Sequence, residues 1–371
     1  MPQVELTYKG LWKGIDTSLP ETDIDPAASP FINNFILRKG EIRSRFRLSS
    51  ICPAPPDNTP VLGLTSFVDS NGLVHTVAIT QLGVYQLSYA FSGINYQGNP
   101  WLVIFNFTSS QTTAPYALGN FQNSIFFSNG SPNTWQWNGI SNVVTNVGNL
   151  AAGGTVGALY LMELAGRIVL ASTVETTGSF PFRVRWSAVN LASTTFDPTV
   201  NIGAGFNDMF DCPDAITGLL PIGRTGYVFR SNGISEMIPT SGQGLAFDFN
   251  HLWASDRGIG NAFPQTLAGF GPMGIFGSGE AFYKITPSSF DDISKGATDQ
   301  ILSDIFNRTG VVAATILPYF HPTYPYTVYM LNITMGNDTV QWLYDLKESS
   351  WTRNFYKNKI FTCKPKYVFV N

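Results

Sequence analysis

The sequence predicts an all-β protein, a β-propeller of about six blades preceded by an extended amino-terminal arm. Three observations lead to this fold class. Short runs of β-branched and aromatic residues are separated by Asn-Gly and other glycine turns. The pattern recurs about every 50 residues, which is the length of a propeller blade. Finally, 35 glycines, 23 prolines and an aromatic content of 14% favour strands and turns over helices.

The clearest unit spans residues 326–353. Residues 326–333 read as a strand, residues 336–338 as a turn and residues 340–346 as the returning strand. A second turn at 347–349 leads into the strand-like residues 350–352. These three strands make a four-stranded blade that lacks one strand, and its apolar faces require neighbouring blades.

Five weaker copies of this unit precede it, at residues 67–87, 121–137, 167–186, 219–238 and 267–285. Together they predict six blades. A large two-sheet β-sandwich would have the same short strands and turns, so it stays open as the alternative fold.

Three regions follow from this pattern: an arm with a hairpin (residues 1–60), the propeller (61–353) and a basic tail (354–371) that can close the last blade. The arm is rich in turn-forming residues, so we expect it to lie on a neighbouring chain. Its hairpin joins residues 34–38 and 41–48 through a Lys39-Gly40 turn. One helix is predicted near residues 298–306, capped by Thr298, with Ile301, Leu302, Ile305 and Phe306 on one face.

Charge is scarce, since Asp, Glu, Lys and Arg make up 13% of the residues. None occurs in the 87 residues from Thr76 to Met162. The longest strictly apolar run there, Trp101 to Phe105, is far shorter than the roughly 20 residues of a spanning helix, so no membrane-spanning segment is predicted. Because charged residues are depleted from interface cores, we expect this region to be buried against other chains.

The first ten residues lack the apolar core of a signal peptide, which predicts synthesis in a cytoplasm. The three cysteines, Cys52, Cys212 and Cys363, are odd in number and widely spaced. This argues against a disulfide framework and predicts free thiols.

No catalytic or metal-binding pattern in the sequence makes a convincing site. His75, His251 and His321 stand apart from other ligand types, and Asp208, Asp211 and Asp214 lack calcium-loop spacing. Residues 269–274 match a dinucleotide fingerprint, but Pro272 and the following glycines prevent the helix that it requires. We therefore expect no enzyme and no cofactor. Residues 128–135 partly match the Ser-x-Asp-x-Gly-x-Thr-Trp box of sialidases, without its Asp and Gly.

Several stretches resemble the hub or nozzle β-propeller proteins in the tails of short-tailed bacteriophages. The opening Gly10-x-x-x-Gly14-Ile15-Asp16-Thr17-Ser18 resembles theirs, followed by residues 33–35 and Lys39-Gly40-Glu41-Ile42-Arg43-Ser44-Arg45. Later stretches are also similar, namely Arg185-Trp186-Ser187 with Phe196-Asp197, residues 216–238 with Phe247, Gly258-Ile259-Gly260-Asn261, residues 274–285 and Ile293-Ser294.

The resemblance implies a structural virion protein, assembled in the host cytoplasm as a ring of six copies around a channel that DNA passes through during ejection. Its implied partners are further copies and other tail proteins, such as adaptor and fibres. Two alternatives stay open. One is a carbohydrate-binding or sialidase-like propeller, and the other is a host-side scaffold that behaves as a monomer.

Positive charge gathers in the hairpin and in the tail, whereas residues 49–352 carry a net charge of −9. A protein that grips DNA would have a basic stripe along its body. We therefore expect the basic residues to contact protein, and the body to bind duplex DNA weakly. The candidate interaction residues are Arg38, Lys39, Arg43, Arg45, Arg47, Lys364 and Lys366.

Overall fold

The fold was analysed in a computed structural model of the chain. The structure describes residues 13–20, 23–25, 27–30, 32–33, 35–38, 41–44, 53–88, 98–189, 196–199, 203–211, 214–240, 246–252, 257–321, 324–357 and 365–366. Cys52, Cys212 and Cys363 lie outside these residues.

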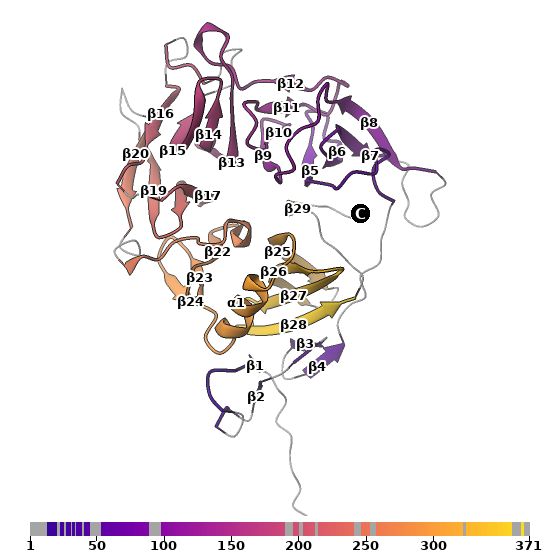
Figure 1. The fold of residues 1–371 in the computed structure, drawn as a ribbon, viewed down its shortest axis with the longest axis vertical. Helices are drawn as coiled ribbons and strands as arrows, with labels where there is room; N and C mark the ends of the chain where they lie inside the picture. Colours follow the sequence, from indigo (N-terminus) through magenta and orange to yellow (C-terminus); the bar gives the residue numbers. More distant parts are fainter. Residues whose placement is uncertain are drawn as a thin grey trace, which may run out of the picture. The chain divides into compact units, whose positions relative to one another are not determined.

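Six sheets, each built on four antiparallel strands, form the blades of a six-bladed β-propeller (Figure 1). The predicted fold class is therefore confirmed, and the β-sandwich alternative is wrong. Each of the six sequence units lies within one blade, because the four antiparallel strands of every blade follow one another along the chain and pair with their sequence neighbours.

The first four blades follow one another along the chain. Their strands are β5 (Gly63–Val68), β6 (Val74–Ile79), β7 (Gly83–Leu87) and β8 (Trp101–Asn106); β9 (Ala117–Phe121), β10 (Ser124–Ser128), β11 (Trp135–Trp137) and β12 (Thr145–Asn146); β13 (Val156–Leu164), β14 (Arg167–Glu175), β15 (Gly178–Trp186) and β16 (Gly205–Asp208); and β17 (Ile216–Ile222), β18 (Thr225–Arg230), β19 (Ile234–Pro239) and β20 (Phe247–His251).

The fifth and sixth blades complete the set. Their strands are β21 (Ala268–Phe270), β22 (Met273–Gly277), β23 (Phe282–Ile285) and β24 (Phe290–Asp292); and β25 (Val312–His321), β26 (Tyr324–Met335), β27 (Asp338–Asp345) and β28 (Ser350–Tyr356). β25 is the strand that the sequence unit at 326–353 lacked. Its pairing with β26 runs from Val312↔Ile333 to His321↔Tyr324.

The described residues divide into two compact units. Those of residues 1–48 and 265–361, which include the fifth and sixth blades, form one unit. Those of residues 49–264 and 362–371, which include the first four blades, form the other.

Apolar side chains are buried between neighbouring blades, which explains why the blades need one another. Phe67 of β5 and Trp137 of β11 belong to one core cluster, with rings 5.5 Å apart at 77°. Met162 of β13 and Val228 of β18 belong to another. All five residues of β10 are buried, as expected of a central strand covered on both faces.

The carboxyl end of the chain contributes a short strand to the first blade. β29 (Pro365–Lys366) pairs in parallel with Leu64 and Thr65 of β5. The last blade is already complete at β28, so this pair of residues extends the first blade, whereas we had expected the tail to close the last one.

The single predicted helix is present as α1 (Thr298–Phe306). Two details of its prediction are wrong. Thr298 is the first helical residue and Ala297 is the N-cap, and the Thr298 hydroxyl donates to the Ser294 carbonyl oxygen at 2.9 Å. Phe306 is exposed, and the buried face of the helix consists of Ile301, Asp304 and Ile305.

Candidate functional site

The described part of the arm packs on the last blade of its own chain. β1 (Gly14–Ile15) and β2 (Ala28–Ser29) form a two-stranded parallel sheet, and β1 contacts β28. Ile15, Ala27 and Ala28 are buried. The expectation that the arm orders on a neighbouring chain is therefore wrong for these residues.

Each residue of the Gly14-Ile15-Asp16-Thr17-Ser18 motif has an identifiable structural part in this contact. Gly14 has φ 81°, and a β-carbon added there would lie 2.8 Å from the Trp351 carbonyl oxygen. Ile15 is buried beside it. The Thr17 hydroxyl donates to the Gly296 carbonyl oxygen at 2.9 Å, while the Asp16 carboxylate accepts hydrogen bonds from the Ser18 amide and hydroxyl. The motif is thus a docking segment for the last blade.

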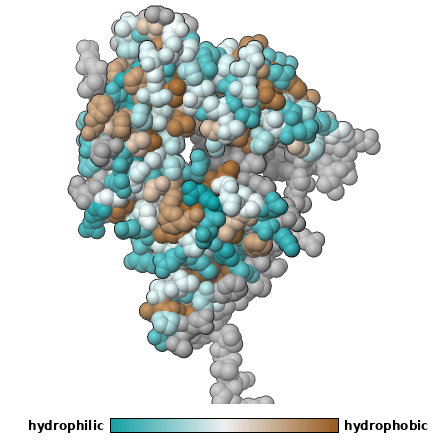
Figure 2. Space-filling model, in the orientation of Figure 1, coloured by the Kyte–Doolittle hydropathy of each residue, from teal (hydrophilic) through white to brown (hydrophobic). Residues whose placement is uncertain are grey.

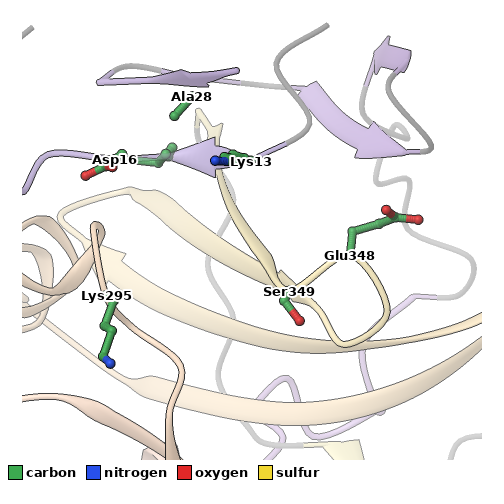
Figure 3. A pocket seen from close by; sticks show the side chains of 7 residues that line it. Lys13, Asp16, Ala28, Lys295, Glu348 and Ser349 are labelled. Carbon is green, nitrogen blue, oxygen red and sulfur yellow. The ribbon is translucent and has the colours of Figure 1, made fainter. Parts of the chain in front are cut away.

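A small pocket of about 330 Å³ lies beside this docking segment. Figure 3 shows Lys13, Asp16 and Ala28 of the arm across from Lys295, Glu348 and Ser349 of the propeller. The charges of the two lining amines, Lys13 and Lys295, are balanced by those of the two lining carboxylates, Asp16 and Glu348. Lys13 also forms an ion pair with Asp25. The pocket therefore favours no particular class of ligand.

Asp304 joins α1 to the last blade, a role that sequence analysis missed. Its carboxylate accepts hydrogen bonds from Trp342 Nε1 at 2.8 Å and from Arg353 Nε and Nη2 at 2.9 and 3.0 Å. A lone carboxylate three residues after Ile301, on the apolar face of the predicted helix, was the available signal.

The arm continues toward this joint as a hairpin of β3 (Phe35–Arg38) and β4 (Glu41–Ser44), paired as predicted. Just before it, Asn33 bridges to Arg353 of β28. Arg38 and Arg43 lie on β3 and β4, and Lys366 lies on β29. Lys39, Arg45, Arg47 and Lys364 lie outside the described residues, so the seven candidate interaction residues stay predictions.

The uncharged region supplies most of the first two blades and the start of the third. Exposed large apolar side chains are frequent on it and just before it. They are Val68, Leu73, Val74, Leu82, Leu102, Val103, Ile140, Val143 and Leu159. Figure 2 shows such apolar residues at the surface among weakly polar ones. A surface with this composition resembles an interface core more than an ordinary solvated face.

His75, treated as isolated at the sequence level, belongs to a buried pair. Its Nε2 lies 3.1 Å from Asp69 Oδ2, and both side chains are 2% exposed. The ring stacks on Phe67 and meets Trp137 of the second blade edge-on. Burial by itself raises the pKa of the Asp69 carboxyl, but hydrogen bonds from His75 and from the Leu73 and Asn71 amides outweigh it and lower that pKa.

The three aspartates at 208, 211 and 214 have separate partners. Arg183 binds Asp208 through two hydrogen bonds of 2.7 Å and lowers the pKa of that carboxyl. The fully buried Arg230 binds Asp211 in the same manner, at 2.7 and 2.9 Å, and Asp214 accepts from Asn232. These carboxylates therefore do not converge as a calcium loop would require.

Residues of the stretches that carry the phage resemblance make contacts inside the third and fourth blades and with their connecting segments. Arg185 contacts Glu175 and the Phe196 carbonyl oxygen, and Trp186 Nε1 donates to the Gly203 carbonyl oxygen. Asn261 bonds the backbone of Arg230 and of Thr217. The resemblance thus lies in residues that maintain the fold.

Residues 128–135, the partial match to the sialidase box, form a turn in the second blade. The Ser128 hydroxyl donates to the Asn133 carbonyl oxygen at 2.8 Å, and the Thr134 hydroxyl donates to the Val156 carbonyl oxygen at 3.0 Å. Both hydroxyls therefore serve the turn and its contact with the third blade.

Among the residues that the structure describes, no group of three or more His, Cys, Asp or Glu side chains lies close enough to hold a metal ion. Within the same residues, no helix has the length and apolar content needed to cross a membrane.

Comparison with known proteins finds similarity among solved structures, where 265 chains match. No family model and no curated protein matches the sequence. A chain of the crystal structure of BBS1N in complex with ARL6DN is similar, with 7% identity over 76% of this chain and 79% of that chain. Its TM-score is 0.42, so it carries no argument about function.

Proposed function

We propose that this chain is a structural protein of a bacteriophage tail, a hub or nozzle propeller that assembles with further copies of itself and with other tail proteins. The observation that carries the proposal is the uncharged surface of the first two blades, with its many exposed apolar side chains. Such a surface is suited to permanent burial between protein chains.

The resemblance to phage-tail propellers supports the same proposal. It implies a ring of six copies, located in the virion tail, around the path of the DNA. The Gly14–Ser18 segment of that resemblance docks the arm on the last blade. The described arm residues and the last blade belong to the same compact unit, so the arm is already placed on that blade before assembly.

The carbohydrate-binding or sialidase-like alternative has less support. Phe206 and Phe210 are exposed near Arg183, an arrangement of aromatic and charged groups that could face a sugar. However, the guanidinium groups of Arg183 and Arg185 are already bonded to Glu175 and Asp208. Binding a sialic acid carboxylate would require breaking these pairs.

The test is quantitative mass spectrometry of tails purified from the phage that encodes the chain. We expect the chain to be present in several copies per tail, in fixed proportion to other tail proteins. Absence of the chain from purified tails would contradict the proposal. In parallel, the purified chain should give no signal on a glycan array, whereas specific binding of one glycan class would favour the alternative.

A further inference from the structure

Two neighbouring turns of the first and second blades expose five large apolar side chains. Val68 and Val74 face each other across the β5–β6 hairpin, Leu73 lies in its turn, and Ile140 and Val143 lie between β11 and β12. Their exposed fractions are 44%, 39%, 51%, 58% and 57%, respectively. We call these five residues the turn patch.

The two turns of the patch contact each other. A β-carbon added at Gly139 would lie 2.6 Å from His75 Nε2 and 3.1 Å from the Asp69 β-carbon, so the second turn rests on the first. Asn123 Nδ2 also donates to the Asp69 carbonyl oxygen at 2.9 Å. The two turns that carry the patch are therefore adjoining parts of the first and second blades.

Hydrogen bonds fix both turns before any partner arrives. The Asp69 carboxylate accepts from the Asn71 and Leu73 amides, at 2.8 and 2.9 Å. In the second turn, the Asn138 side-chain oxygen accepts from the Ile140 amide at 3.1 Å, and Trp137 Nε1 donates to the Ser141 carbonyl oxygen. A fixed surface loses little conformational entropy on binding.

The charge distribution indicates what covers the patch. No Asp, Glu, Lys or Arg occurs from Ser70 to Met162, and the Asp69 carboxylate is buried. A charged partner would be desolvated here without gaining an opposite charge. A second copy of this chain, by contrast, brings the same uncharged and partly apolar surface. Two copies can therefore bury apolar area without burying a charge.

We infer that the turn patch is a contact between copies of this chain. This inference deepens the proposed function, on which it rests, by naming the surface through which copies assemble. The occupant is the uncharged region of a neighbouring copy.

Size-exclusion chromatography with light scattering on the full chain tests this inference. At about 100 µM, a concentration that populates even weak contacts, the unmodified chain should form oligomers. Ile140→Lys and Val143→Lys should each weaken self-association about tenfold or more, because the new ammonium group would be buried unpaired. Val189→Lys is the matched control, since Val189 is 47% exposed but lies outside the uncharged region. Circular dichroism would verify that each variant is folded.

Three results would overturn the inference: a monomeric unmodified chain, patch variants that assemble normally, or an equal loss in Val189→Lys. A loss in Val103→Lys of β8 with no loss at residues 140 and 143 would also overturn it. These outcomes differ from failure of the proposed function. If the chain is present in tails and the lysine substitutions in the patch do not affect assembly, only the inference is contradicted. If the chain assembles through the patch but is absent from tails, only the proposed function is contradicted.

Discussion

Single residues decide whether the arm can dock, and Gly14 is the most constrained of them. Its φ of 81° is strained for any other residue, and its neighbour is the backbone carbonyl of Trp351, which cannot rotate away as a side chain would. Gly72 has nearly the same φ, 82°, but no atom lies within 4 Å of an added β-carbon.

Replacing each of these two glycines with alanine separates the effect of backbone strain from that of the clash. Gly72→Ala should cost about 1 kcal/mol of unfolding free energy from backbone strain alone. Gly14→Ala should release the arm, because the clash with the Trp351 carbonyl oxygen adds to the backbone strain. Limited proteolysis should then cleave Gly14→Ala within the arm and leave Gly72→Ala as resistant as the unmodified chain. Equal resistance of the two variants would refute this account of the motif.

At this scale, sequence analysis was most successful where chemistry is local. Glycine turns depend on their own backbone angles, so the spacing of Asn-Gly pairs identified the blades. The Asp69–His75 pair and the partners of Asp208 and Asp211 depend on residues brought together by pairing between strands or blades. A single sequence does not specify those distances, and these contacts were missed.

Among the elements, α1 is tied to the last blade by one carboxylate. Asp304 is 10% exposed and bonds both Trp342 and Arg353. Asp299 lies in the first turn of the same helix and is exposed. The two residues therefore allow a comparison within one helix.

Asp304→Asn should destabilise the chain by about 3 kcal/mol, since it leaves a largely buried guanidinium without its counter-charge. Asp299→Asn should change the unfolding free energy by less than about 0.5 kcal/mol, as expected of a surface position. Urea unfolding followed by tryptophan fluorescence would measure both. If Asp304→Asn is as stable as Asp299→Asn, the carboxylate does not join helix and blade.

At the element scale, the structure places the described arm residues differently from the prediction. We expected the arm to lie on a neighbouring chain. Because Ile15, Ala27 and Ala28 are buried, deleting residues 1–30 should instead uncover apolar surface on the last blade. The helix and the six blades were predictable from periodicity, whereas the arm and β29, which have no periodic pattern, were not placed by the sequence.

For the whole molecule, the uncharged region is the feature that most needs a functional explanation. A solvated propeller would be expected to carry charges throughout its surface, with about a quarter of its residues charged. Here charged residues are missing from Thr76 to Met162, which supplies most of the first two blades, while apolar side chains of those blades remain exposed. Assembly with other chains accounts for both facts, and it is the central claim of the proposed function.

Native mass spectrometry of the purified full chain tests that claim most directly. We predict a closed assembly of identical copies, six if the resemblance to phage-tail propellers extends to stoichiometry. The assembly should persist at raised salt, because apolar contacts are not screened as ion pairs are. A chain that remains monomeric at about 100 µM, where a contact worth about 5.5 kcal/mol is half formed, would contradict the claim.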